Sequence, residues 1–296
     1  MRLLVFLLLL CSIAFPQSIE DRLKTRIGTF DGTVSLYAKN LETGVSVGLR
    51  PGEPVRTAST IKLPIMLAVF DAVERGKATW TEQLTVTMAD KVSGSGIIGN
   101  ELSDGVKLPL SDVLHLMMVL SDNSATNMLL ERFKADAVND YLDTLGLKTT
   151  RSMRKVRGDG NQLKAAAGFS KAGLLPENEK YGLGVSTPRD MVTILEMLDK
   201  GAIVSAEASK EMLKIMKRCR DDTGVRRRLG STAIANKTGA LDALRSDVAL
   251  VYSKGGKIAM AITVDGMPKI DYTPDNVGSL LIADLAKIIV DGLAKK

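Results

Sequence analysis

Ser59 and Lys62 stand three residues apart in the segment Ser59-Thr60-Ile61-Lys62. On a helix this spacing places both side chains on one face, so the lysine nitrogen would lie near the serine hydroxyl. A serine hydroxyl becomes nucleophilic when a base takes its proton, and a lysine is such a base when burial and neighbouring cations lower its pKa. Taken alone, the tetrapeptide favours a simpler interpretation, in which a serine caps a core helix and a lysine extends to solvent.

Two further groups of polar residues also have simple interpretations when each is taken alone. Ser121-Asp122-Asn123 lies between two predicted helices and is typical of a helix cap. Lys237-Thr238-Gly239 is predicted to close a strand that begins at Ile234, as a strand-end turn does. The three groups together, in this order and at these spacings, are far more specific than any one of them, and the simple interpretations no longer suffice.

The composition excludes several other classes of function. The chain has 296 residues, of which 45% are hydrophobic and 25% charged, as is typical of a globular protein. One histidine, His115, and two cysteines, Cys11 and Cys219, are too few for a metal site of ordinary type, and we expect no metal and no cofactor. The net charge of +6 is spread along the chain with one tight basic run at 226–228, so we expect no nucleic-acid partner.

The N-terminus has the pattern of a secretory signal peptide. Arg2 is followed by an uncharged apolar run from Leu3 to Ala14, which is too short to span a membrane as a mature helix. We assign residues 1–17 to the signal and expect an exported protein, periplasmic or secreted, without a stable membrane span. An uncleaved membrane anchor is the alternative.

The hydrophobic pattern predicts an α+β protein. A helix from Ile19 and a β-hairpin over 34–49 come first, then helices over 59–76, 110–120, 124–133, 135–145, 187–200 and 205–218. Pro64 lies beyond the first turn of the predicted 59–76 helix, where it would remove a hydrogen bond. Short β-branched strands over 234–237, 248–252 and 258–264 precede a last helix.

This order of elements predicts one domain over residues 18–296. We expect an antiparallel sheet built by both chain ends, from 30–58 and 230–265, with flanking helices and an inserted all-helical lobe over about 60–200.

With its three motifs, the sequence resembles the class A β-lactamase family, a group of serine β-lactamases related to penicillin-binding proteins. The segment from Gly94-Ser95-Gly96-Ile97 to Asn127 and the helix opening Thr187-Pro188-Arg189-Asp190 are also similar to that family. The resemblance covers most of the mature chain. It implies the serine β-lactamase and penicillin-binding fold and a substrate that is a β-lactam or a cell-wall peptide, and we expect a monomer.

The resemblance also implies a role for each motif residue in acylation. Ser59 would attack the carbonyl carbon, Lys62 would help to activate it, and Ser121 would pass a proton to the leaving nitrogen. The N–H groups of Ser59 and Ala240 would form the oxyanion hole.

Substrate binding is implied for a second set of residues. Lys237 would bind the substrate carboxylate together with Thr238 and the adjacent Gly239, and would hold Ser121 electrostatically. Asn123 would hydrogen-bond the acylamide side chain of the substrate. Arg245, on the strand after the Lys-Thr-Gly group, would add a second cation, or else form an ordinary surface pair.

The sequence departs from the family at the residue that activates the deacylating water. In the family this residue is a loop glutamate, and Val156 stands in its place here. A valine can neither take a proton nor hold a water molecule. Glu177 and Glu179, and with less support Asp159, are the carboxylates of this segment that could replace it, or else they are simply solvated.

Three functions therefore stay open at this point. The first is a β-lactamase-type serine hydrolase with slow deacylation. The second is a penicillin-binding or D-Ala-D-Ala peptidase-like enzyme on the same scaffold. The third is a binding module that has lost the chemistry, which the presence of Ser59, Lys62, Ser121 and Lys237 argues against.

Overall fold

A computed structural model describes residues 17–294, so the predicted signal peptide lies outside the described residues except for Gln17. The α-helices are α1 Ile19–Ile27, α2 Lys62–Glu74, α3 Ile98–Glu101, α4 Leu110–Val119, α5 Asn123–Phe133, α6 Ala135–Thr144, α7 Pro188–Asp199, α8 Ala206–Lys217 and α9 Val277–Leu293. The 3₁₀ helices are η1 Ala58–Ile61, η2 Gly160–Gln162, η3 Ala172–Leu174, η4 Pro176–Tyr181 and η5 Val225–Arg228.

The main sheet has five antiparallel strands in the order β2-β1-β10-β9-β8. Its strands come from both ends of the described chain, which confirms the predicted fold class. Two small sheets, β3-β7-β6 and β4-β5, lie outside it. The strands are β1 Thr33–Asn40, β2 Ser46–Leu49, β3 Val55–Arg56, β4 Gln83–Thr85, β5 Lys107–Pro109, β6 Arg151–Ser152, β7 Gly184–Ser186, β8 Ile234–Leu241, β9 Leu244–Ser253 and β10 Gly256–Asp265.

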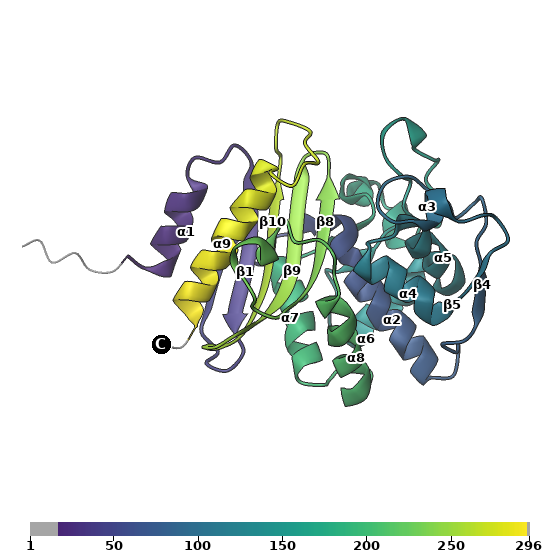
Figure 1. Cartoon of the computed structure of the whole chain (residues 1–296), viewed down its shortest axis with the longest axis horizontal. Coiled ribbons are helices and arrows are strands. Elements are labelled where there is room, and N and C mark those ends of the chain that lie inside the picture. The colour runs from purple at the N-terminus through teal and green to yellow at the C-terminus, as the bar shows by residue number, and fades with distance from the viewer. Residues whose placement is uncertain (1–16, 295–296) are drawn as a thin grey trace, which may run out of the picture.

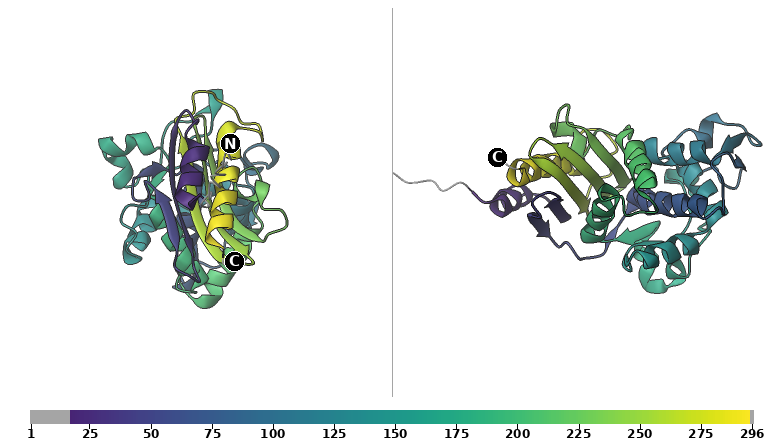
Figure 2. Two further views of the ribbon diagram at one scale, coloured as in Figure 1. Left: turned by 90° about the vertical axis from the view of Figure 1, so that its left-hand side faces the viewer. Right: turned by 90° about the horizontal axis from the view of Figure 1, so that it is seen from below.

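Helices cover both faces of the main sheet and form two hydrophobic cores. On one face α1 and α9 lie side by side, and Leu23 and Ile289 pack with buried strand residues (Figures 1 and 2). On the other face α7 packs on β1 and β10, while α8 packs on β8. The helices α2 to α6 lie beyond them and form the helical lobe (Figure 1). Because α7 covers the sheet, the last part of the predicted 60–200 lobe contacts both halves of the molecule.

The helix α2 is buried from Lys62 to Phe70, as its uniformly apolar sequence predicts. It begins later than predicted, because residues 58–61 form the tighter turn η1. Pro64 is therefore the third residue of α2 and lies in its first turn, where a backbone nitrogen has no partner inside the helix. The predicted conflict between Pro64 and the helix is wrong for this reason.

The prediction that Lys237-Thr238-Gly239 ends a strand is also wrong. The strand β8 continues through these residues to Leu241, and its pairing with β9 includes Thr238 with Asp247 and Ala240 with Arg245. The turn follows at residues 242–243, between β8 and β9. The backbone hydrogen bonds of the ladder therefore fix the geometry of this motif.

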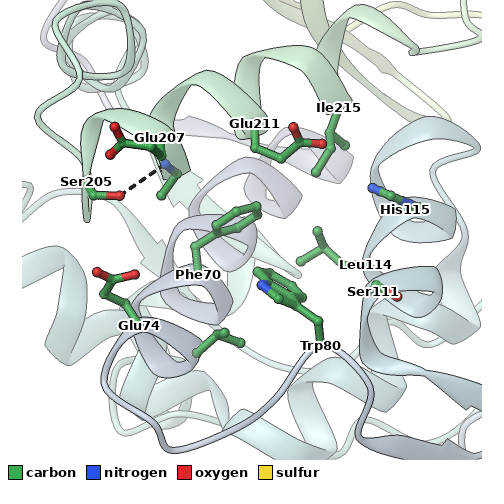
Figure 3. Close-up of a pocket in the computed structure, with 12 residues that line it drawn as sticks. Phe70, Glu74, Trp80, Ser111, Leu114, His115, Ser205, Glu207, Glu211 and Ile215 are labelled. Carbon is green, nitrogen blue, oxygen red and sulfur yellow. Dashed lines mark hydrogen bonds between the residues drawn. The ribbon is translucent and has the colours of Figure 1, made fainter.

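Two further features of the described residues are a cavity and a free cysteine. Helices α2, α4 and α8 surround a cavity of about 400 Å³ (Figure 3). Cys219 is a buried free thiol.

Within residues 17–294, no helix is both long and apolar enough to cross a membrane.

A buried aspartate links the edge strand β8 to the segment that precedes it. Asp247 lies on β9, is 1% exposed, and accepts hydrogen bonds from the backbone N–H of Val225 at 2.9 Å and from Asn236 Nδ2 at 3.1 Å. Gly224 is required beside it, because a Cβ there would lie 2.6 Å from Asp247 Oδ2. Burial raises the pKa of Asp247 to about 7, since the charged form loses its hydration.

This raised pKa predicts a specific loss of stability with pH. The folded state holds the Asp247 proton more tightly than the unfolded state, so its contribution is complete below the unfolded pKa and disappears as pH rises through about 7. Between pH 5 and pH 8 we expect the free energy of unfolding of the parent to fall by about 3 kcal/mol more than that of Asp247→Asn. Urea unfolding at both pH values measures this difference. Asp31→Asn, at an exposed aspartate, is the control and should follow the parent.

Candidate active site

The turn η1 holds Ser59 against the edge of the main sheet. Ala58, the residue before it, has a φ of 47°, which is strained for a residue with a side chain. The strand β8 packs on this turn at Gly239. A Cβ at Gly239 would lie 2.8 Å from the carbonyl oxygen of Thr57 and 3.0 Å from the backbone nitrogen of Ser59. Glycine is therefore needed for the strand to approach the backbone of Ser59.

A second strained residue, Ser121, lies in the turn between α4 and α5, with a φ of 56°. The next residue, Asp122, is fully buried and holds this turn in place. Its carboxylate accepts hydrogen bonds from the backbone N–H groups of Ala125 at 2.8 Å, Ile97 at 2.7 Å and Ile98 at 2.9 Å. Asp122 thus caps α5 and ties the 93–98 loop to the turn that carries Ser121.

The amine of Lys62, which is fully buried at the first residue of α2, extends to this turn. Its Nζ lies 2.6 Å from the carbonyl oxygen of Ser121, 2.9 Å from Asn123 Oδ1 and 3.2 Å from Ser121 Oγ. Among the described residues, no hydrogen bond joins it to the hydroxyl of Ser59, which differs from the helical-face expectation. The reason is that the strained turn brings three polar atoms of residues 121 and 123 to the amine.

Lys237, also fully buried, approaches the same hydroxyl from β8. Its Nζ donates to Ser121 Oγ at 3.0 Å and to the carbonyl oxygen of Thr238 at 2.8 Å. The hydroxyl of Ser121 therefore lies between two lysine amines that come from different halves of the molecule.

This arrangement favours a neutral amine at Lys62. Burial lowers the pKa of Lys62 well below its ordinary value, and the nearby cation of Lys237 lowers it further. The carboxylate of Asp122 opposes this shift in the pKa of Lys62 without outweighing it. Burial also lowers the pKa of Lys237, but Asp221 and Asp247 oppose that effect.

The hydrogen-bond partners of the two amines agree with this assignment. A neutral Lys62 has two N–H donors for its two obligate acceptors, the carbonyl oxygen of Ser121 and Asn123 Oδ1. Its lone pair can then accept the hydroxyl proton of Ser121, while Lys237 donates to the oxygen of that hydroxyl. The contacts thus form a chain along which a proton can move from Ser121 to Lys62.

The remaining predicted binding residues line the same region. Asn123 donates from Nδ2 to the carbonyl oxygen of Ser93 at 3.1 Å, which leaves one Nδ2–H free of that bond. Thr238 is buried beside Asp221, whose pKa is lowered because hydrogen bonds from Thr223 and Thr238 outweigh the cost of its burial. Ala240, one residue beyond Gly239, is exposed on the edge strand.

Arg245 stands opposite Ala240 on β9, but most of its contacts are with the backbone. Its guanidinium donates at 2.6 Å to the carbonyl oxygens of Leu241 and Leu244, and it also donates to that of Asp271. Its Cζ lies 4.8 Å from the centre of the Tyr272 ring. Arg245 therefore holds the segment after β10 against the site and also places a cation beside the edge strand.

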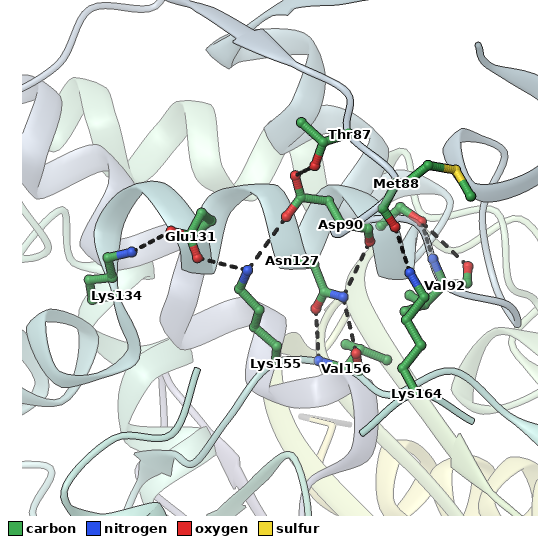
Figure 4. A network of polar contacts seen from close by, with 11 residues as sticks. Thr87, Met88, Asp90, Val92, Asn127, Glu131, Lys134, Lys155, Val156 and Lys164 are labelled. Atoms are coloured by element: carbon green, nitrogen blue, oxygen red, sulfur yellow. Dashed lines mark hydrogen bonds and ion pairs between the residues drawn. The ribbon is translucent and has the colours of Figure 1, made fainter. Parts of the chain in front are cut away.

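The loop between β6 and β7 carries Val156, whose backbone is fixed by Asn127 on α5. Asn127 Oδ1 accepts from the Val156 N–H at 2.8 Å, and its Nδ2 donates to the Val156 carbonyl oxygen at 3.0 Å (Figure 4). The adjacent Lys155 forms an ion pair with Glu131 at 2.8 Å and a longer one with Asp90 at 3.5 Å (Figure 4). The backbone position of residue 156 is thus fixed, but its side chain has no polar atoms.

The loop carboxylates are divided between two places. Glu177 and Glu179 lie exposed on η4, and no described contact joins either to Ser59, Lys62 or Ser121. Asp159 lies nearer the motif residues.

Gly94 shows how close Asp159 comes. A Cβ at Gly94 would lie 3.0 Å from Asp159 Oδ2 and 2.7 Å from Asn123 Nδ2. Asp159 is also close enough to Tyr272 to add to the burial that raises the pKa of that hydroxyl to about 12. Asp159 and Tyr272 therefore lie at the mouth of the site, on the loop after β6 and the segment after β10.

Sequence reasoning did not identify the roles of Asn127 and Asp122. The spacing of Asn123 and Asn127, four residues apart on one helix, signals that both amides lie on one face of α5. Nothing in the local sequence indicates that Asp122 collects three backbone N–H groups, because two of them come from a distant loop. Within residues 17–294, no three His, Cys, Asp or Glu side chains are grouped so that they could hold a metal ion.

Comparison with known proteins places this geometry in a family. The model of the β-lactamase enzyme family matches residues 18–293. The β-lactamase regulatory protein BlaB of Streptomyces cacaoi is 23% identical over 292 residues, which cover 88% of this chain and 93% of that protein.

Two solved structures are similar over nearly the whole chain. A β-lactamase from Sphaerobacter thermophilus has a TM-score of 0.79 and 26% identity, and the match covers 93% of this chain and 97% of that one. A mutant of PBP-A, solved as an acyl-enzyme complex with penicillin G, has a TM-score of 0.77 and 27% identity, covering 92% and 94%. With a family model that spans residues 18–293, the chain belongs to the β-lactamase enzyme family and is a hydrolase of the β-lactamase type.

Proposed function

We propose that this protein opens β-lactam rings by forming an acyl-enzyme on Ser59 and that it releases the product slowly. The observation that carries this proposal is the hydroxyl of Ser121, held between the buried amines of Lys62 and Lys237. Such a pair of lysines supplies one neutral base and one cation beside a single hydroxyl, which is what ring opening requires.

In the proposed acylation, the hydroxyl oxygen of Ser59 attacks the ring carbonyl carbon and its proton passes to the neutral amine of Lys62. The negative charge on the carbonyl oxygen is stabilised by the N–H groups of Ser59 and Ala240. The C–N bond of the ring then breaks, and Ser121 gives its proton to the leaving nitrogen. Lys62 returns a proton to Ser121 along their 3.2 Å contact, which restores the serine hydroxyl.

The substrate carboxylate is proposed to bind near Lys237 and Thr238, with Arg245 adding a cation from the neighbouring strand. Asn123, whose side-chain oxygen is occupied by Lys62, is proposed to donate its remaining N–H to the acylamide group of the substrate. The first proposal is supported by the burial of Lys237, Thr238 and Arg245 on two paired strands, and the second by the contact of Asn123 with Lys62.

Deacylation is proposed to be slow because Val156 occupies the backbone position that Asn127 fixes. The backbone of this residue is held in place, yet the valine side chain offers no base. Of the three loop carboxylates, Asp159 is the one that the structure places beside Asn123 and Gly94. It is the strongest candidate for residual deacylation, ahead of Glu177 and Glu179.

The second candidate function is a penicillin-binding or peptidase-like enzyme on the same scaffold, whose acyl-enzyme persists. The same observation at Val156 favours it, and the structural likeness to PBP-A supports it. A binding or regulatory role without chemistry would not explain why two lysine amines are buried at one serine hydroxyl, since burying an amine costs free energy. Covalent labelling by a penicillin would exclude that role.

We also propose that the chain acts outside the cytoplasm, in the periplasm or after secretion, and as a monomer. The proposal of export rests on Arg2 and the apolar run from Leu3 to Ala14.

Ser59→Ala should abolish covalent labelling by a fluorescent penicillin, because it removes the only oxygen proposed to bond to the substrate. The measurement is gel fluorescence after mixing, with circular dichroism to show that the fold is retained. Thr60→Ser, which keeps a hydroxyl at the neighbouring buried position, is the control and should label like the parent. Labelling of Ser59→Ala at the parent level would remove Ser59 from the mechanism.

Lys237→Ala should lower kcat/KM for acylation about a hundredfold and also change its pH dependence. The cation of Lys237 lowers the pKa of Lys62, so its removal should raise that pKa. The acid limb of the pH profile reports the base, and it should therefore move to higher pH. Lys237→Arg keeps the cation and should leave the limb near its parent position. If the acid limb of the kcat/KM profile of Lys237→Ala stays at the pH of the parent, Lys62 is not the base.

Stopped-flow measurement with nitrocefin should show a burst of one ring opened per protein molecule, followed by slow turnover. Val156→Glu should keep the burst and raise the steady rate, because Asn127 holds that position for the new carboxylate. Val156→Gln, which has the same shape without a base, is the matched control and should turn over as slowly as the parent.

Three further variants identify any residual base. Asp159→Asn should slow the steady rate and leave the burst unchanged, whereas Glu177→Gln and Glu179→Gln should behave like the parent. Fast linear turnover without a burst, unchanged in all three variants, would contradict the proposed role of this loop.

A further inference from the structure

The cavity between α2, α4 and α8 shares no residue with the site described above. Its volume of about 400 Å³ lies within the range of small-molecule sites in proteins. It lies along the second half of α2, from Phe70 to Glu74, whereas Lys62 begins that helix. The cavity therefore has its own lining.

The interior of the cavity is aromatic and aliphatic. Phe70 and Trp80 meet edge to face with ring centres 4.7 Å apart and planes at 64°. Leu114 from α4 and Ile215 from α8 complete the apolar surface (Figure 3). Trp80 is partly exposed, so part of its ring is available to a bound molecule. An apolar body of suitable size would bury this surface favourably.

The charged groups that line the cavity are all acidic. They are the carboxylates of Glu74, Glu207 and Glu211 (Figure 3), and no lysine or arginine is among the lining residues. Glu211 is paired with Lys214 at 3.2 Å. Within residues 17–294, the side chains of Glu74 and Glu207 have neither a hydrogen bond nor an ion pair.

The one remaining titratable group of the lining, His115, does not offset this charge. Burial lowers its pKa, and the cation of Arg218 lowers it further. The imidazole is therefore neutral at pH 7. The cations nearest the cavity, Lys214 and Arg218, are not among its lining residues. An apolar interior with two unpaired carboxylates is complementary to a ligand that combines an apolar body with a positive charge.

We propose that this cavity binds an amphipathic organic cation, a small molecule with an aromatic or branched alkyl body and one ammonium group. The body packs on Phe70 and Trp80, and the ammonium group lies between the carboxylates of Glu74 and Glu207. This inference does not depend on the proposed β-lactam chemistry, because none of the acylation residues takes part.

The chain contains a single tryptophan, Trp80, so its fluorescence reports on this cavity alone. The probe is 4-phenylbutylammonium, and its matched control is 4-phenylbutyrate, which has a similar body with the opposite charge. We expect the cation to change the tryptophan emission in a saturable way and the anion to bind at least about tenfold more weakly.

Variants separate this site from adventitious binding. The double variant Glu74→Gln/Glu207→Gln should weaken binding of the cation about tenfold, the size expected for loss of a charge-assisted contact. Glu53→Gln, at an exposed glutamate outside the cavity, should bind like the parent. Ala208→Phe, which fills the cavity from α8, should abolish the saturable change.

Three outcomes would overturn the proposal. They are the absence of a saturable change with the cation, equal affinity for the cation and the anion, and unchanged affinity for the cation in the double glutamine variant. The two glutamates are exposed, so these substitutions should not disturb the fold, and circular dichroism checks this. Because no β-lactam is present in the titration, its failure would leave the proposed acylation untouched.

Discussion

The structure depends most on the placing of two buried lysine amines at one serine hydroxyl. Lys62 and Lys237 are both fully buried, and each lies within hydrogen-bond distance of Ser121 Oγ. Two ammonium groups so close together would repel each other strongly in a site of low polarity. The repulsion is relieved when one amine is neutral, and the hydrogen-bond partners of Lys62 allow this state. Burial disfavours the charged form of Lys62, and the neutral amine that results can act as a base.

The backbone around the site is arranged to keep these three groups together. Ser121 has a left-handed conformation, which a residue with a side chain adopts at a cost of about 1 kcal/mol or more, and Asp122 offsets that cost with three backbone hydrogen bonds. The edge strand β8 brings Lys237 to the site, and Gly239 lets that strand approach the turn of Ser59. Asp247 fixes the other side of β8. The site therefore joins the sheet, which supplies Lys237, to the helical lobe, which supplies Ser121.

Much of this could be predicted from the sequence, because the motifs and the hydrophobic periods are local signals. The helices and the antiparallel sheet from both chain ends follow from residue spacing, and the pairing of Lys237 with Ser121 follows from the resemblance. The errors lie where tertiary contacts override local patterns. Lys237-Thr238-Gly239 has the composition of a turn but continues as a strand, because pairing with β9 outweighs the low strand propensity of glycine. Helical spacing predicts Lys62 beside Ser59, but the turn at Ser121 supplies its partners. Val156 and Asp159 reach the site through folding of a long loop, which no local pattern indicates.

The central claim is that this chain forms a stable acyl-enzyme on Ser59, and intact-mass spectrometry with benzylpenicillin tests it most directly. The account predicts that one adduct of the full mass of benzylpenicillin forms rapidly, maps to the peptide that contains Ser59, and persists after free penicillin is removed. A spectrum that shows only unmodified protein at every time after mixing, or an adduct on a peptide without Ser59, would contradict the account.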